Sequence, residues 1–201
     1  MSAQQHQPHI FLASESPRRQ QLLGQIGVAF EPVRQDVQEF PDPGESPEVF
    51  VIRLALDKAR AGLAGRPGES RLPVLGADTI VVLDDRVLGK PADQAEFLDF
   101  MEELSGRAHR VLTGVALVDG EREATRLSVS NVTLRDVDPA ERQAYWRSGE
   151  PADKAGGYAI QGRGAVFVES LEGSYSGVMG LPLFETSDLL AEFDIDYQRC
   201  W

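Results

Sequence analysis

The junction between an apolar run, residues 10–13, and a helix-forming stretch carries two hydroxyls and two guanidinium groups, those of Ser14, Ser16, Arg18 and Arg19. A helix N-terminus presents free N–H groups and a partial positive charge, so a strand that leads into it makes an anion site. The two hydroxyls add donors, and the guanidinium groups match phosphate oxygens. A plain N-cap followed by solvated arginines is the alternative, but four such residues on one turn favour phosphate binding. The glycine-rich run and GK[ST] of a Walker loop are missing.

A single carboxylate interrupts the apolar stretch VLGADTIVVL, residues 74–83. This residue, Asp78, would destabilise the fold if it were buried without a partner, so we expect it to meet a metal, a cation or the edge of a cleft. The small residues Gly76 and Ala77 beside it would let a ligand approach closely. A structural aspartate bonded to nearby backbone is the alternative, and the sequence favours the functional role.

Two lysines are placed to serve the same cleft as Asp78. Lys90 follows it across a hairpin-like return, with Gly89 and Pro91 restricting its backbone, and Lys58 is the charge in the helical stretch LALDKARAGL. Each lysine alone is typical of a solvated surface cation. Together with a carboxylate and a divalent metal, however, cations of this kind stabilise the leaving group in phosphoryl transfer.

A glutamine among glycines is the third candidate for ligand binding. Gln161 stands in the segment EPADKAGGYAIQGRGAVFV, residues 150–168, and its amide both donates and accepts hydrogen bonds, as the edge of uracil or thymine does. A surface glutamine in a tight loop explains the same residues equally well.

His109 is more typical of a structural histidine, and the scattered histidines do not have the spacing of a zinc site.

Strands and helices that alternate along the chain must position these residues. We predict strands at 9–13, 73–83, 111–118 and 126–134, a short return strand that ends at Gly89, and helices from Pro17 to Gly24 or Gly27, from Pro47, at 92–104, from Asp138 and at 182–193. Some of the strands are joined by short turns, which favours an α/β fold with a mixed sheet. The acidic stretch 36–48 is predicted to be a largely solvated loop.

Two finer expectations concern packing. In the helix that begins at Pro47, apolar residues recur at intervals of three and four and are expected to face the core. They are Val49, Ile52, Leu56, Ala59 and Leu63. Residues 156–180 hold seven of the 19 glycines, so we predict loops and short strands there, where the backbone comes close to another group.

The composition excludes several classes of protein. The net charge is −12 and the pI about 4.7, which disfavours general nucleic-acid binding. The start of the chain lacks signal-peptide features, and the longest strongly apolar stretch, 80–83, is too short to span a bilayer, so we expect a cytoplasmic protein that does not bind membranes. Cys200, the one cysteine, is expected to be an idle tail residue. Residues 1–8 are predicted to be a flexible tail and 9–201 a single catalytic domain.

Six segments in order along the chain resemble the Maf family of nucleoside triphosphate pyrophosphatases. They are SESPRRQQLL, LALDKARAG, GADTIVVLDDRVLGKP, LSGRAHRVLTGVAL, SGEPADKAGGYAIQGRGAVFV and GSYSGVMGLPLFET, spread over residues 14–186. The resemblance implies an elongated α/β fold with a mixed β-sheet, flanking helices and two lobes around a cleft, similar to the inosine triphosphatase family. It also implies hydrolysis between the α and β phosphates, a divalent metal such as Mg²⁺ or Mn²⁺, and a homodimer.

The resemblance implies roles for individual residues as well. Asp78 would act as the proton acceptor. The residues that would bind the phosphates are Ser14, Arg18, Lys58 and Lys90. An acidic residue after the first helix would help Asp78 to hold the metal, and we choose Glu39 over Asp36, which lies in the same loop.

Three positions separate the subfamilies within this resemblance. Members that act on dTTP and UTP carry a second arginine in SPRR, a threonine after the motif aspartate and the glutamine of IQG, which here are Arg19, Thr79 and Gln161. We therefore expect a dTTP/UTP pyrophosphatase that clears modified pyrimidine nucleotides. One alternative is a 7-methyl-GTP pyrophosphatase, whose subfamily has a glutamate in place of the glutamine. The other is a nucleotide-sensing regulator of septum formation, in line with the link between the family and cell division.

Overall fold

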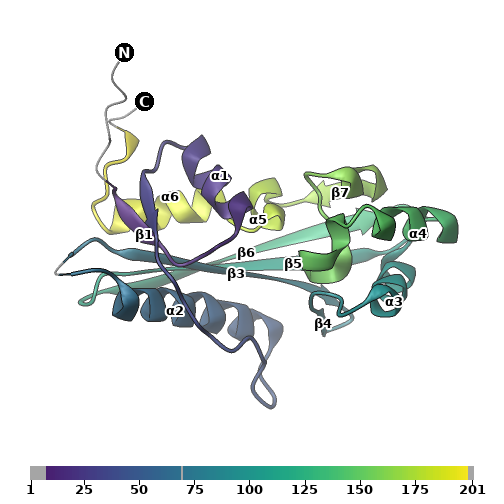
Figure 1. The fold of residues 1–201 in the computed structure, drawn as a ribbon, viewed down its shortest axis with the longest axis horizontal. Helices are drawn as coiled ribbons and strands as arrows, with labels where there is room; N and C mark the ends of the chain where they lie inside the picture. The colour runs from purple at the N-terminus through teal and green to yellow at the C-terminus, as the bar shows by residue number, and fades with distance from the viewer. Residues whose placement is uncertain (1–7, 69, 199–201) are drawn as a thin grey trace.

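The computed structural model describes residues 8–68 and 70–198, and its centre is a mixed β-sheet with helices on both faces (Figure 1). The strands are β1 (Ile10–Leu12), β2 (Phe30–Pro32), β3 (Val74–Leu83), β4 (Arg86–Leu88), β5 (Ala108–Val118), β6 (Glu123–Leu134) and β7 (Val168–Glu172). The α-helices are α1 (Pro17–Gln25), α2 (Pro47–Gly65), α3 (Gln94–Leu104), α4 (Pro139–Arg147), α5 (Tyr175–Met179) and α6 (Leu183–Glu192). Three 3-10 helices, η1 (Glu150–Asp153), η2 (Ala155–Gly157) and η3 (Arg163–Phe167), follow α4. The α/β class with a mixed sheet is confirmed.

Strand β3 has a gap along one of its edges. The strands lie in the order β2-β1-β3-β5-β6-β7, with β1 parallel to both neighbours and the other pairs antiparallel. On the edge of β3 opposite β5, β1 pairs as far as Leu75 and β4 pairs from Val81 onward. No strand in the described part of the chain pairs with β3 between these two positions. We call this gap, at residues 76–80, the notch.

Successive side chains of a strand point to opposite faces of a sheet, which decides what each side of the notch presents. Ala77 and Val81 belong to a core cluster on one face, and Ile80 belongs to a separate cluster with α2 on the other. By the same alternation Asp78 lies on the face covered by α2. Thr79 lies on the opposite face, which α1 and α6 cover (Figure 1).

Helix α2 packs very close to the sheet because two strand residues have no side chain. A Cβ atom at Gly76 would lie 2.6 Å from the backbone nitrogen of Ala59, and one at Gly114 would lie 2.6 Å from the carbonyl oxygen of Val51. The space beside Gly76 is therefore filled by α2, and the expectation that it admits a ligand was wrong. The close packing brings Lys58, on the buried side of α2, to the notch.

The predicted apolar stripe of α2 was wrong in part. Val49 is exposed, and only Ala59 of the five predicted residues is fully buried. The buried face is formed by Phe50, Val51, Leu54, Ala55, Lys58, Ala59 and Gly62. Counting apolar residues misplaces this face, because a glycine and a charged lysine belong to it. The N-cap at Ser46 is confirmed, since its hydroxyl accepts the N–H of Val49 at 3.4 Å.

Other differences from the sequence prediction involve short elements. The prediction omits β2, which has three residues, and α5, a five-residue helix in the glycine-rich region where only loops and short strands were expected. The predicted tail, residues 1–8, lies outside the described residues except for Pro8, and Cys200 lies outside them as well. No helix in the described part of the chain has the length and apolar character needed to cross a membrane.

His109, on β5, is buried, and its Nε2 lies 2.7 Å from Oη of Tyr158. Burial lowers the pKa of His109 to about 4. An imidazole that is kept neutral in the core fits the structural role predicted for this residue.

We predict that mild acid destabilises the protein through His109. Its pKa is lower in the folded chain than the 6.5 of an exposed histidine, so the stabilisation is complete above pH 6.5 and is lost as the pH falls toward 4. The expected loss is about 3 kcal/mol in the free energy of unfolding. Urea unfolding between pH 7 and pH 4 measures it, and His109→Gln should remove this part of the pH dependence. Identical pH profiles for the two proteins would contradict the prediction.

Candidate active site

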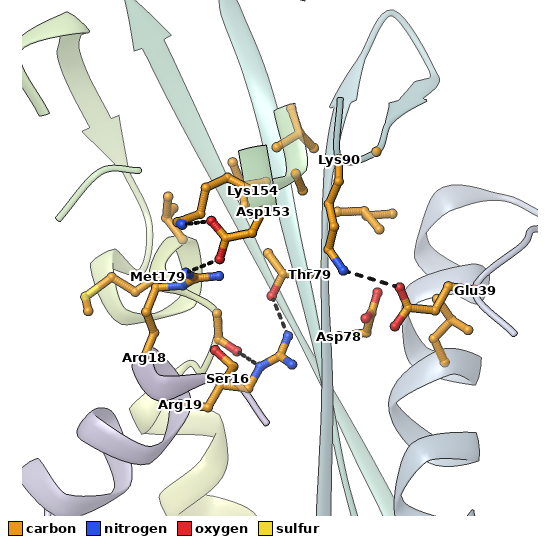
Figure 2. Close-up of a pocket in the computed structure, with 18 of the residues that line it drawn as sticks. Ser16, Arg18, Arg19, Glu39, Asp78, Thr79, Lys90, Asp153, Lys154 and Met179 are labelled. Carbon is orange, nitrogen blue, oxygen red and sulfur yellow. Dashed lines mark hydrogen bonds and ion pairs between the residues drawn. The ribbon is translucent and has the colours of Figure 1, made fainter. Parts of the chain in front are cut away.

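The notch opens into a cleft of about 850 Å³. It is lined by parts of α1, α2 and β4 and by residues of the segment 153–161. The cleft reaches both faces of β3, with Asp78 on the α2 side and Thr79 on the α1 side (Figure 2). Every residue that the sequence analysis assigned to the site lines this cleft: Ser14, Ser16, Arg18, Arg19, Glu39, Lys58, Asp78, Thr79, Lys90 and Gln161.

Two carboxylates meet one lysine on the α2 side of the cleft. The Nζ of Lys58 donates hydrogen bonds to Oδ1 of Asp78, at 2.5 Å, and to Oε1 of Glu39. The side chain of Lys58 is 5% exposed and that of Asp78 is 11% exposed, so water screens their interaction only weakly. Lys58 is therefore not the solvated cation that its residue type alone suggests.

Glu39 extends from the acidic loop toward two lysines. Its Oε2 lies 3.8 Å from Nζ of Lys90, whose side chain is 62% exposed (Figure 2). Burial alone would raise the pKa of Glu39, but the hydrogen bond and charge of Lys58, together with Lys90 and Arg19, hold the pKa below its ordinary value. Asp36, the other acid considered in this loop, is exposed and does not line the cleft. Glu39 is thus the acid of the loop that reaches the site.

Arg19 lies on the α1 side of the notch, and hydrogen bonds to three residues hold its side chain in place. Its Nε donates to the carbonyl oxygen of Gly180 at 2.7 Å. Its two terminal nitrogens donate to Oγ of Ser14, at 3.2 Å, and to Oγ1 of Thr79, at 3.4 Å. Burial lowers the pKa of Arg19, although an arginine remains protonated at neutral pH. The guanidinium is therefore fixed in place without a ligand.

Ser14, and not Ser16, organises the turn before α1. Ser16 has the extended backbone of an N-cap, and Pro17 follows at the first helical position as predicted, but the Ser16 hydroxyl makes no capping hydrogen bond. Instead, the buried hydroxyl of Ser14 accepts the N–H of Ser16 at 3.2 Å. The Ser16 hydroxyl is left at the cleft, where it can bind an oxygen atom of a ligand.

Arg18 points toward a pair of residues to which the sequence analysis gave no role (Figure 2). Its Nη1 lies 3.5 Å from Oδ2 of Asp153, which also pairs with Lys154. Asp153 and Lys154 line the cleft. Asp153 and Lys154 are an acid and a base next to each other in the sequence, which is the only local sign of a role for them. Because 135 positions separate Arg18 from Asp153, only the fold reveals the contact between these two residues.

Gln161 lies in the loop between η2 and η3 and lines the cleft. Its side chain is exposed and takes part in none of the hydrogen bonds within residues 8–68 and 70–198. The amide is therefore available to a ligand. The structure thus gives the predicted base-reading residue a suitable position.

The carboxylates suit a divalent cation that arrives with a substrate. In the part of the chain that the structure describes, no group of three or more His, Cys, Asp or Glu side chains is arranged to hold a metal ion. Glu39 and Asp78, however, both bind the same nitrogen of Lys58, so their oxygen atoms lie close together. Mg²⁺ is commonly bound through one or two carboxylates together with substrate phosphates. The pair fits such an ion when a nucleotide supplies the remaining ligands.

Comparisons with known proteins agree with this architecture. The family model described as Maf-like protein matches residues 9–193. A dTTP/UTP pyrophosphatase from Alkalilimnicola ehrlichii is 62% identical over 200 residues, which cover 98% of each of the two chains. Proteins of the same name from Saccharophagus degradans and Aromatoleum aromaticum are 52% and 51% identical, over 92% and 93% of this chain and 89% and 96% of theirs.

Proposed function

The chain belongs to the family of Maf-like proteins, and on this basis we propose that it hydrolyses dTTP and UTP to the nucleoside monophosphate and pyrophosphate. The observation that carries the proposal is the arrangement at the notch, where Asp78 and Glu39 meet at Lys58. Arg18 and Arg19 line the same cleft from α1. The names of relatives that are up to 62% identical support the same activity.

In the proposed reaction, Asp78 accepts a proton from a water molecule. The water oxygen attacks the α phosphorus, the bond from this phosphorus to the oxygen that bridges it to the β phosphorus breaks, and pyrophosphate leaves with that oxygen. Lys58 orients the carboxylate through its 2.5 Å hydrogen bond. Lys90 and Arg18 stabilise the negative charge that develops on the leaving group.

Glu39 and Asp78 would hold Mg²⁺ or Mn²⁺ together with the phosphates of the substrate. The cation would neutralise phosphate oxygens as charge develops on them. Glu39 also contacts Lys58 and Lys90, so it keeps both ammonium groups on the side of the cleft where the phosphates bind.

Selection of the base is assigned to Arg19, Thr79 and Gln161. The amide of Gln161 offers a donor beside an acceptor, which match the N3–H and the adjacent carbonyl of uracil or thymine. The ring of 7-methylguanine carries a positive charge and a donor-rich edge, for which a carboxylate is better suited than an amide. The glutamine at this position therefore favours pyrimidine nucleotides.

Product analysis over a panel of nucleotides tests the proposal. With Mg²⁺ or Mn²⁺, UTP should yield UMP and pyrophosphate, and oxygen from isotopically labelled water should appear in UMP. Release of orthophosphate, or label in pyrophosphate, would contradict the mechanism. Equal or better turnover of 7-methyl-GTP would overturn the assignment to pyrimidines. Binding without turnover of any nucleotide would favour the sensing role in septum formation.

The two arginines of the first turn should have separable effects. Arg18→Ala removes a cation that binds phosphates, so we expect kcat/KM to fall by about tenfold or more for every nucleotide. Arg19→Ala should instead reduce the preference for UTP over GTP by about tenfold, because an arginine that is held rigidly beside the nucleoside contributes mainly to selectivity. Steady-state kinetics with both nucleotides measures the difference. Equal losses on UTP and GTP in both variants would refute the separation.

Further parts of the proposal concern the whole protein. Residues 9–201 are treated as a single catalytic domain, which is supported by the family match over residues 9–193. The homodimer, the location in the cytoplasm, the removal of modified pyrimidine nucleotides and the link to septum formation stay predictions. The net charge of −12 supports a small-molecule substrate over a nucleic acid.

A further inference from the structure

The loop that carries Gln161 has little regular structure of its own. It spans the few residues between Gly157, the end of η2, and Arg163, the start of η3. An exposed amide on such a loop can reach many positions, so its direction depends on what fixes the loop. Ala159 and Ile160 are buried, and beyond them the side-chain hydrogen bonds that hold the loop converge, directly or through Tyr145, on one carboxylate outside the cleft, that of Glu150.

Glu150, the first residue of η1, accepts three hydrogen bonds. Its Oε2 accepts the N–H of Arg163 at 3.0 Å, and its Oε1 accepts the N–H of Gly164 at 3.1 Å. The hydroxyl of Tyr145 donates to Oε1 at 2.7 Å and itself accepts the N–H of Ala159 at 3.0 Å. The loop is therefore tied to this carboxylate on both sides of the base-reading amide.

The carboxylate packs directly against the turn of the loop. A Cβ atom at Gly162 would lie 2.6 Å from Oε1 of Glu150, so a side chain there would displace the carboxylate. Burial alone would raise the pKa of Glu150, but the N–H groups of Arg163 and Gly164 and the hydroxyl of Tyr145 hold the pKa below its ordinary value. Glu150 is thus ionised at neutral pH, and its three hydrogen bonds are charge-assisted.

The partners of Glu150 distinguish it from a glutamate of a surface ion pair. Among the described residues, no lysine or arginine side chain donates a hydrogen bond to its carboxylate. Lys154 donates instead to the backbone carbonyl of Glu150, at 3.3 Å. The charge of Glu150 is therefore used to hold main-chain groups of the loop.

We propose that Glu150 is a positioning residue for base selection, which holds residues 159–164 so that the amide of Gln161 faces the cleft. This inference rests on the proposed function, since it requires Gln161 to contact the base. Glu150 does not line the cleft, and the phosphate-binding residues come from other elements. Loss of Glu150 should therefore affect recognition of the base and leave the chemical step largely intact.

The test is a double-mutant cycle between Glu150→Gln and Gln161→Ala. Whichever way the new amide is turned, one of the two backbone N–H groups loses its acceptor, because a glutamine has only one acceptor oxygen. We expect KM for UTP to rise, and the preference for UTP over GTP to fall, by about tenfold, with kcat changed much less. The double variant should be no worse than Gln161→Ala, because both substitutions remove the same interaction.

Two further variants separate positioning from general destabilisation. Glu141→Gln is the matched control, because Glu141 also accepts a backbone N–H, that of Asp138 at 3.0 Å, but its side-chain partner is Arg135 and not the loop of Gln161. It should leave the nucleotide preference unchanged. Tyr145→Phe keeps Glu150 but breaks the link to Ala159, so it should reproduce a smaller form of the Glu150→Gln phenotype if that variant does not fold.

Three results would overturn the inference: additive losses in the cycle, an equal fall in kcat for UTP and GTP, or unchanged preference in Glu150→Gln. Hydrogen exchange gives a readout that does not depend on activity, and the amides of Arg163 and Gly164 should lose protection in Glu150→Gln. If the wild-type protein itself released no pyrophosphate or showed no preference for UTP, the proposed function would fail. If the wild type had both properties and Glu150→Gln kept the preference, only the role of Glu150 would fail.

Discussion

Replacing Asp78 with asparagine should lower kcat for UTP hydrolysis by about a thousandfold, with little change in KM. Asparagine keeps the shape of the side chain, and its carbonyl oxygen can still accept the hydrogen bond from Lys58. It cannot accept a proton from water. Single-turnover measurements of UMP formation at saturating UTP and metal would measure the chemical step directly.

The control for Asp78→Asn is Asp57→Asn. Asp57 is a carboxylate on α2 that lies 3.4 Å from Nη1 of Arg53 and does not line the cleft, so its loss should change kcat by less than about twofold. Retention of more than about a tenth of the wild-type rate in Asp78→Asn would contradict its role as the base. A larger loss in Glu39→Gln than in Asp78→Asn would assign proton transfer to Glu39.

The second large effect is expected for Lys58→Met. Methionine fills a similar volume but leaves Asp78 and Glu39 facing each other without the cation that now joins them. We expect kcat/KM for UTP to fall by about two orders of magnitude. We also expect a loss of about 3 kcal/mol in the free energy of unfolding, because one partner of a buried ion pair is removed. Steady-state kinetics with Mg²⁺ measures the first effect, and urea unfolding in metal-free buffer measures the second.

Added Mg²⁺ gives a readout of Lys58→Met that does not depend on activity. With the ammonium gone, a divalent cation can take its place between the carboxylates, so Mg²⁺ should raise the Tm of the variant more than that of the wild type. The matched control is Arg60→Met, which removes an exposed cation of the same helix that pairs with Glu123. A variant as stable and active as this control would show that Lys58 does not organise the site.

The parts of the fold that could be predicted are those with a strong local pattern. The long apolar strand around Asp78 is predicted by its composition, and the hairpin-like return predicted after it is present, with Asp84 and Asp85 in the positive φ values of a two-residue hairpin turn. Strand β2 has only three residues, and α5 contains Gly177 within its five, so neither gives a periodic signal. Their place in the fold depends on long-range contacts, which a pattern does not encode.

The candidate site shows the same division between local and long-range information. The cationic turn before α1 and the acid in β3 were found because residues of unusual type stand in a clear local context. The burial of Lys58 could not be predicted from its type, because it follows from the close approach of α2 to Gly76. Contacts such as Arg18 with Asp153, or Glu150 with the loop of Gln161, join distant parts of the chain and required the fold.

The short length of the notch has a consequence for aggregation. An unpaired strand edge is a template on which another chain can add a strand. An apolar core strand such as β3 would promote aggregation if its whole edge were open. Here the open edge extends only over residues 76–80 and is closed at its ends by β1 and β4. A foreign strand cannot extend beyond either end, and the charges of Lys58 and Asp78 lie beside the gap. The two short strands β1 and β4, which frame the cleft, therefore also limit the addition of a strand from another chain to β3.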